Sequence, residues 1–242
     1  SNEIINVAAP EAAHSVQVQG AGSVLQLSNS LVVSDFLEVT ATNSLVLNGP
    51  LTFGSKVTSD GVVTWNGAPL TGPEFLVSSG TFDANTAAIH NLDTTLSVGA
   101  AGTVTIDGVL QGSGAIDNRA GVVNLTNDTA GQSYTVGVTN RTSGTMSLIA
   151  STSPSLSFSF TGVTLLNAGL LLLDDLVSDG LGVTLTFDPG QQLTNSGTLR
   201  TLGVVDNRVI DGDVVNTGTF EVDHNLRVVT DGNIFDTSDG AV

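Results

Sequence analysis

The sequence has no cysteine, a single lysine and few aromatic residues, and each scarcity removes a class of protein. Without cysteine there is neither a disulfide framework nor a thiolate metal site. Six Lys and Arg side chains stand against 23 Asp and Glu side chains, which gives a formal charge of −17. Binding to nucleic acid or to anionic lipid requires clustered cations that displace counterions. We therefore expect no nucleic-acid partner.

Long apolar runs and helix signals are scarce as well. The longest apolar run, Leu170 to Leu173 with its neighbours, is far shorter than the roughly 20 residues of a membrane-spanning helix, so we expect no membrane insertion. Only residues 85–92, which include Ala87 and Ala88, have helix-forming character, and they allow at most a short helix. The apolar content of 40% is nevertheless enough for a sizeable core.

Most segments have the two-residue period of strands. Apolar and polar residues alternate in 156–160 and in 183–187, which predicts half-buried strands. The leucine runs at 165–166 and 170–173 do not alternate, and they predict strands buried on both faces or a strand followed by an inward corner. Aspartate outnumbers glutamate, and six Asp-Gly pairs predict tight corners between strands.

One sequence motif, called the coil phrase below, occurs three times in the C-terminal half, at residues 165–171, 193–199 and 214–220. Each copy places Asn two residues before Gly, with a large apolar residue two before the Asn and another four after it. The copies begin 28 and 21 residues apart, which is the spacing of stacked coils that bury their apolar faces against one another. We expect Leu171, Leu199 and Phe220 to share one buried row.

The repeated corners are candidate structural sites. Asn tolerates a left-handed backbone, and its amide both donates and accepts hydrogen bonds, so inward Asn side chains of successive coils could bond to one another as a ladder. The alternative is that Asn-x-Gly is simply a common turn. The predicted corner residues are Asn167, Gly169, Asn195, Gly197, Asn216 and Gly218.

A domain boundary is predicted near residue 72. Two prolines and two glycines between Gly67 and Pro73 are expected to interrupt a strand ladder. Residues 1–72 are then an irregular β-rich segment and residues 73–242 a β-solenoid. Residues 116–119 and 205–208 are also similar in sequence, and their separation corresponds to about four coils.

The phrases at 193–199 and 215–220 resemble the L-x-N-x-G-x-L coils of right-handed parallel β-helices in bacterial filamentous haemagglutinins, autotransporter passenger domains and related adhesins. The resemblance covers roughly residues 100–242 and implies a secreted stalk or adhesive surface without enzymatic activity. A weaker likeness relates residues 62–72 to junction segments of phage tail fibres.

Catalytic candidates are weak. Asp174 and Asp175 resemble the paired aspartates of β-helical polysaccharide hydrolases, but adjacent residues of a strand point to opposite faces. A polar strand end is therefore the preferred interpretation. The three histidines, His14, His90 and His224, share no motif with Ser or Cys and are expected at the surface or in turns. We expect no enzymatic activity.

One metal site is a candidate. Asp211 and Asp213 flank Gly212 in the most acidic part of the chain, and calcium prefers carboxylate and carbonyl oxygens. The competing interpretation is a pair of solvated turn carboxylates. No other cofactor is expected.

Together these patterns predict an all-β fold, a parallel β-solenoid with a less regular N-terminal β segment. The expected function is that of an extracellular or cell-surface structural or adhesive protein, part of an appendage, filament or layer. The alternatives are a phage tail-fibre or virion decoration protein, and a glycan-binding or glycan-cleaving β-helix. We expect head-to-tail self-association, with Ser15 to Gln19 as the donated strand, and a glycan or cell surface as partner.

Overall fold

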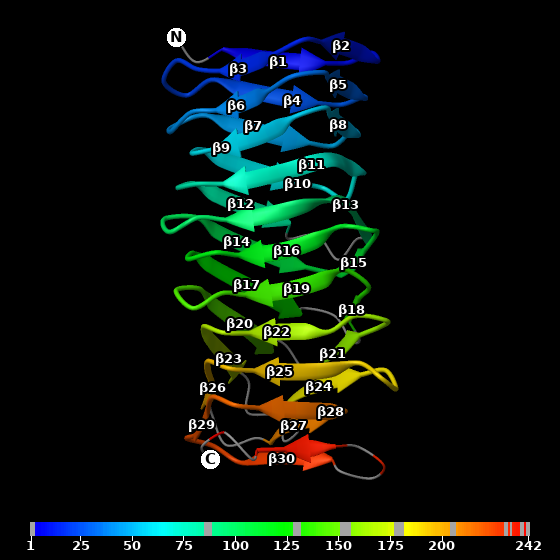
Figure 1. Cartoon of the computed structure of the whole chain (residues 1–242). Helices are drawn as coiled ribbons and strands as arrows, with labels where there is room; N and C mark the ends of the chain where they lie inside the picture. The colour runs from blue at the N-terminus through cyan, green and yellow to red at the C-terminus, as the bar shows by residue number, and fades with distance from the viewer. Residues whose placement is uncertain are drawn as a thin grey trace.

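The computed structural model describes residues 3–84, 89–127, 132–150, 156–176, 182–203, 207–229, 232, 234–237 and 240. These residues form a β-solenoid of about 10 turns with parallel sheets, and none of them is helical. Figure 1 shows the coils stacked from one end of the molecule to the other, with the N-terminus in the first coil. The predicted fold class is confirmed.

Most coils contribute one strand to each of three faces. Face 1 is a single 11-stranded sheet. Its strands are β1 (Ile4–Val7), β4 (Val24–Leu27), β7 (Ser44–Leu47), β10 (Val62–Trp65), β12 (Thr81–Ala84), β14 (Thr103–Asp107), β17 (Val122–Asn127), β20 (Thr145–Ala150), β23 (Leu170–Asp175), β26 (Thr198–Gly203) and β29 (Thr219–Val222).

Face 2 follows face 1 along the chain in every coil. Its strands are β2 (Glu11–Ala13), β5 (Leu31–Val33), β8 (Leu51–Phe53), β15 (Val109–Gln111), β18 (Gln132–Tyr134), β21 (Leu156–Phe160), β24 (Val183–Phe187), β27 (Arg208–Asp211) and β30 (Leu226–Val229).

Face 3 completes each coil. Its strands are β3 (Val16–Val18), β6 (Leu37–Val39), β9 (Lys56–Ser59), β16 (Ala115–Asn118), β19 (Gly137–Asn140), β22 (Leu165–Asn167), β25 (Gln192–Asn195), β28 (Asp213–Asn216) and β31 (Phe235–Asp236). Two longer strands, β11 (Leu70–Val77) and β13 (Ile89–Val98), run across faces 2 and 3.

The coils stack in the predicted register. Leu171 pairs with Leu199, and Leu199 pairs with Phe220, in three adjacent strands of face 1. All three side chains are buried, so the expected row is confirmed. The periods of 28 and 21 residues differ mainly in the connections. Both the connection from β23 to β24 and the connection from β24 to β25 are longer than their counterparts in the next coil, from β26 to β27 and from β27 to β28.

The leucine runs are not buried on both faces as expected. In β23, Leu171 and Leu173 are buried, whereas Leu170 and Leu172 are half-buried, and Leu166 of β22 is exposed. The wall of a solenoid is a single sheet with the core on one side and water on the other, so even an unbroken apolar run alternates. The candidate helix at 85–92 is also wrong where it can be examined, because residues 89–92 belong to β13, and residues 85–88 lie outside the described part.

The coil is already present before residue 72. Ile4 pairs with Val24, Val24 with Ser44, and Ser44 with Val62. Within residues 67–73, β11 begins at Leu70, and its pairing with β13 shifts register between Thr71 and Glu74. The division into two domains stays a prediction.

Aromatic side chains fill the interior in two ways. Near the middle of the stack, Trp65 and Phe75 each meet Phe82 edge to face, with ring centroids 5.6 and 5.4 Å apart. Further along face 2, the rings of Tyr134, Phe160 and Phe187 stack coil upon coil. Both arrangements are favourable geometries for aromatic pairs, and they tie successive coils together.

Candidate functional site

The predicted asparagine ladder exists and occupies the corner between faces 3 and 1. The Nδ2 amide of Asn167 donates to Oδ1 of Asn195 at 2.6 Å, and that of Asn195 donates to Oδ1 of Asn216 at 2.6 Å. All three side chains are buried. Each amide also bonds to backbone carbonyl oxygens, such as that of Thr198 from Asn167. The three asparagines therefore join successive coils to one another.

The glycines of these corners are explained by close contact between coils and not by backbone conformation. Gly169, Gly197 and Gly218 do not have positive φ, and Thr42 is the one described non-glycine residue that does. A Cβ at Gly197 would collide with the backbone of Ala168 and Gly169 in the preceding coil. Glycine is required because the coils approach each other closely, since only a residue without Cβ fits there.

The ladder is longer than the sequence predicted. Asn140 donates to Asn167 at 2.7 Å, and Asn118 donates to Asn140 at 2.8 Å, and both are buried. In the coil of Asn140 the corner glycine is Gly144, which lies four residues after the asparagine instead of two. The Asn-x-Gly motif therefore does not identify this coil. The similarity between 116–119 and 205–208 is not a structural repeat, because Arg119 follows β16 on face 3 whereas the corresponding Arg208 begins β27 on face 2. Residues 205–206 lie outside the described part.

The candidate metal residues flank a corner. Asp211 ends β27 and Asp213 begins β28, with Gly212 at a positive φ of 146° between them. The Oδ1 of Asp213 accepts a hydrogen bond from the backbone N–H of Ile234 at 2.7 Å. Among the described residues there is no group of three or more His, Asp or Glu side chains arranged to hold a metal ion. Calcium at this corner stays a prediction.

The paired aspartates lie on opposite sides of the wall, as argued from the strand geometry. Asp175 is buried, whereas Asp174 is only half-buried. Two such carboxylates cannot flank one glycosidic bond.

The histidines differ from one another. His14 is exposed, and its Nδ1 lies 3.0 Å from the Ser34 hydroxyl. His90, expected at the surface, is instead fully buried, with its ring 4.7 Å from that of Trp65 and its Nε2 3.1 Å from the carbonyl oxygen of Asp107. The prediction for His90 was wrong because this residue occupies an inward position of β13.

Tyr134 is also buried in the interior. Its burial, and then the charge of Asp107, raise the pKa of Tyr134, so its hydroxyl stays protonated.

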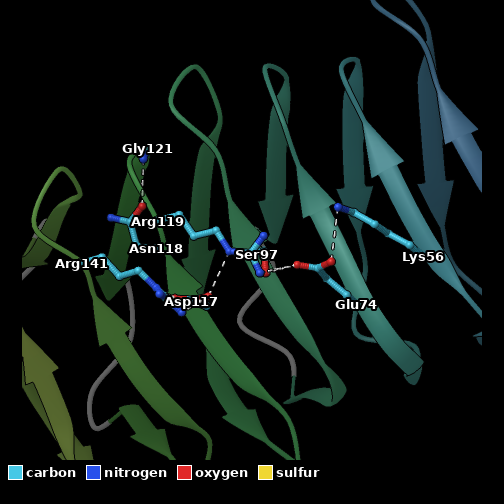
Figure 2. Close-up of polar contacts among 8 residues, drawn as sticks. All are labelled: Lys56, Glu74, Ser97, Asp117, Asn118, Arg119, Gly121 and Arg141. Atoms are coloured by element: carbon cyan, nitrogen blue, oxygen red, sulfur yellow. Dashed lines mark hydrogen bonds and ion pairs between the residues drawn. The ribbon is translucent and has the colours of Figure 1, made fainter.

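A charged cluster on face 3 was not predicted. It comprises Lys56, Glu74, Asp117, Arg119 and Arg141, and we call it the face-3 cluster (Figure 2). Glu74 lies 3.3 Å from the Lys56 ammonium and 2.6 Å from the Arg119 guanidinium, and it accepts a hydrogen bond from the Ser97 hydroxyl at 2.7 Å. Except for Asp117 and Arg119, these residues are far apart in sequence, and only the coil register brings them together.

Asp117 is the centre of this cluster. Arg141 donates to it through Nε at 2.6 Å and Nη2 at 2.9 Å, and Arg119 donates through Nε at 3.1 Å. Burial by itself would raise the pKa of Asp117, but the hydrogen bonds and charges of the two guanidinium groups outweigh it, and the pKa is lowered. The pKa of Glu74 is lowered in the same way, against burial, by Ser97, Lys56 and Arg119.

A cleft of about 420 Å³ adjoins this cluster at the corner between faces 3 and 1. Its lining includes Thr139, Arg141, Leu166, Thr194 and Ser196. Thr139, Leu166 and Thr194 are paired neighbours of β19, β22 and β25 and alternate with buried residues, so they form an outward row. Together the cleft and the cluster are the candidate functional site.

Comparison with known proteins identifies no matching family model, curated protein or solved structure. Within the described residues, no helix has the length and apolar character needed to cross a membrane.

Proposed function

We propose that this protein is a non-enzymatic extracellular structural or adhesive β-solenoid, a subunit or segment of a surface appendage, filament or layer. One observation carries this proposal: the buried polar side chains of the corner are used to hold coil to coil. Five asparagines, from Asn118 to Asn216, bond in an unbroken line. Such a stack resists bending and shear, because sliding one coil breaks the bonds on both sides of it.

The resemblance of the coil phrases to filamentous haemagglutinins and autotransporter passenger domains supports the same function. The acidic surface fits it as well, since a charge of −17 keeps a long stack soluble and separate from other acidic surfaces. A hydrolase is less well supported, because Asp174 and Asp175 face opposite sides of the wall.

Self-association along the stacking axis is part of the proposal. In the described part of the chain, strands β1, β2 and β3 have a paired neighbour on one side only. The N–H of Val16 points to the next coil, where it donates to Phe36, so the N–H of Gln17 points to the open edge. Another strand can add there, from a second copy or from a preceding coil.

The test uses one edge residue. Gln17→Pro removes the N–H on the open edge and leaves the bond from Val16 to Phe36 in place, whereas the control Gln17→Ala keeps that N–H. Electron microscopy and light scattering of the purified chain should show end-to-end assemblies for the control and mainly monomers for Gln17→Pro. Equal assembly of both variants, or none in the unmodified protein at high concentration, would contradict association through this edge.

A second candidate, glycan binding, is favoured by one specific observation: an open cleft with hydroxyl groups and an arginine on face 3.

A further inference from the structure

The cleft has a simple structural cause. The residues that directly follow the ladder asparagines form a column of their own, in which Ala168 N donates to Asn140 O and Ser196 N donates to Asn167 O. Arg141 precedes these two small residues in the column, and its side chain turns toward Asp117 in the previous coil (Figure 2). A hollow remains where Ala168 and Ser196 fill little space.

This hollow lies beside an unusual concentration of positive charge. The face-3 cluster holds three of the six Lys and Arg residues of the chain, and only two carboxylates, Glu74 and Asp117, are paired with them. The cluster therefore carries a net charge of +1 on a protein of −17. The groups nearest the cleft, Arg141, Arg119 and Asp117, also sum to +1. An anion in the cleft responds mainly to these groups, because the Debye length at physiological salt is about 8 Å and Lys56 lies four coils away from Arg141.

Arg141 retains unused donors. A guanidinium has five N–H groups in a fixed planar arrangement. Asp117 accepts one N–H from Nε and one from Nη2. Three N–H groups remain, and two of them form a second fork that matches a carboxylate. The bond to Asp117, whose side chain is 11% exposed, fixes the orientation of this fork.

The rest of the lining suits a polyhydroxylated ring. Thr139, Thr194 and Ser196 offer hydroxyl groups, and the 43% exposed Leu166 lies between the two threonines as an apolar contact for ring C–H groups. Three coils at about 4.8 Å spacing give a length of roughly 10 Å, which accommodates a short oligosaccharide. Stacking on an aromatic ring is not used, since Trp65 and Tyr134 are both buried.

From these observations we infer that the cleft binds an acidic saccharide containing a uronic acid. Its carboxylate pairs with the free fork of Arg141, and its ring lies over Leu166 between the hydroxyl groups. The inference deepens the adhesive side of the proposed function and rests on it for its biological setting. Binding itself is a property of the isolated chain and is measured separately from assembly.

The experiment is a titration of the full chain with trigalacturonic acid, followed by backbone amide NMR shifts. The matched probe is the methyl ester of the same trisaccharide, which keeps the ring and removes the charge. Arg141→Lys keeps the positive charge but loses the fork, and Leu166→Ser removes the apolar contact. Arg200→Lys is the control, because Arg200 is similarly exposed and also pairs with an aspartate, Asp223, but on face 1.

We expect shifts around Thr139, Leu166 and Thr194 with the acid and far weaker ones with the ester. Arg141→Lys should weaken binding about tenfold or more, Leu166→Ser should weaken it several-fold, and Arg200→Lys should leave it unchanged. Three results would each overturn the site: no shifts in the folded wild-type protein, equal binding of acid and ester, or undiminished binding by both variants. Equally tight binding of a simple peptide carboxylate would overturn the saccharide assignment. If any of these results is obtained while end-to-end assembly is intact, the proposed structural function still holds.

Discussion

An asparagine at a buried corner satisfies two requirements at once. Its amide donates to the asparagine of the next coil and accepts from that of the previous one, so each interior member of the ladder uses both ends of its side chain. In the water-free interior such bonds polarise one another, and a missing partner is costly. The ladder therefore fixes the register of successive coils and also stabilises the stack.

Asn195→Ala tests this role. The substitution removes the bond from Asn167 and the bond to Asn216, and both of these partners are buried, so each lost bond should cost about 1–3 kcal/mol. Asn66→Ala, which removes a single exposed bond to Asn48, is the control and should change stability by about 0.5 kcal/mol or less. Urea denaturation gives both values. Equal effects would show that the ladder contributes nothing beyond an ordinary surface hydrogen bond.

Leu199 tests the apolar row of face 1. It is fully buried between Leu171 and Phe220, so Leu199→Ala should cost about 2–5 kcal/mol through lost burial and the cavity left behind. The control is Leu176→Ala, because Leu176 is 60% exposed and should tolerate truncation. Melting temperatures provide the comparison, and a Leu199→Ala variant as stable as the control would be incompatible with the register.

At the scale of strands, the face-3 cluster connects elements that the chain separates widely. Lys56 lies on β9, Glu74 on β11, Asp117 on β16, and Arg141 follows β19. The residues occupy neighbouring positions across face 3 and not a single column: Lys56 pairs with Glu74, and Ser97 pairs with Asp117 further along the strands. Arg119 and Arg141 follow the ends of β16 and β19, and their long side chains reach back to the carboxylates. Exposed ion pairs contribute little individually, but Asp117 is nearly buried and shared by two arginines, which makes it the member whose loss matters most.

Acid should weaken this cluster. The folded pKa values of Asp117 and Glu74 are lowered below their ordinary values, so the folded protein binds fewer protons than the unfolded chain. The stabilisation is complete above about pH 4–5, near the unfolded pKa values, and is lost as the pH falls through the lower folded values.

Asp117→Asn tests that pH dependence. The variant should be less stable than the wild type at pH 7, and the difference should shrink as the pH falls below about 4. Asp60→Asn, which also removes one surface charge, controls for net charge. Melting temperatures measured across the acid range decide the question. A difference between Asp117→Asn and the wild type that does not change with pH would contradict the assignment.

The sequence predicts the strands better than their exposure. The phrases around Asn167, Asn195 and Asn216 were sufficient to predict the ladder, because matched apolar residues surround each of them. The burial of both faces predicted for the leucine run of β23 is wrong, because the apolar composition of the run does not show that its strand belongs to a single-sheet wall with one face toward solvent. The face-3 cluster could not be predicted, because pairing Asp117 with Arg141 requires the coil length, and coil lengths vary with the connections.

At the scale of the whole molecule, charge dominates. A formal charge of −17 with three of its six cations in one cluster leaves most carboxylates without a nearby counterion, so self-repulsion should lower stability at low ionic strength. Raising sodium chloride toward about 0.1 M, where the Debye length is about 10 Å, should raise the melting temperature.

Calcium separates screening from binding. If the ion occupies the corner of Asp211 and Asp213, millimolar calcium should raise the melting temperature more than sodium chloride of the same ionic strength, because a ligand of the native state adds RT ln(1 + [L]/Kd). Asp213→Asn should abolish the excess. Equal responses to the two salts would remove the calcium site and leave two solvated turn carboxylates.

The in-register stack is the claim on which every other inference depends, and the absence of native cysteine allows a direct measurement by crosslinking. Thr194 pairs with Val215 in the adjacent strand, a spacing of about 4.8 Å that a disulfide can bridge. Leu166 lies one coil further away, at about 10 Å from Val215, beyond the reach of a disulfide. We expect rapid oxidation of Thr194→Cys with Val215→Cys and none of Leu166→Cys with Val215→Cys within one molecule. Crosslinking of the second pair, or failure of the first in the folded protein, would contradict the stack.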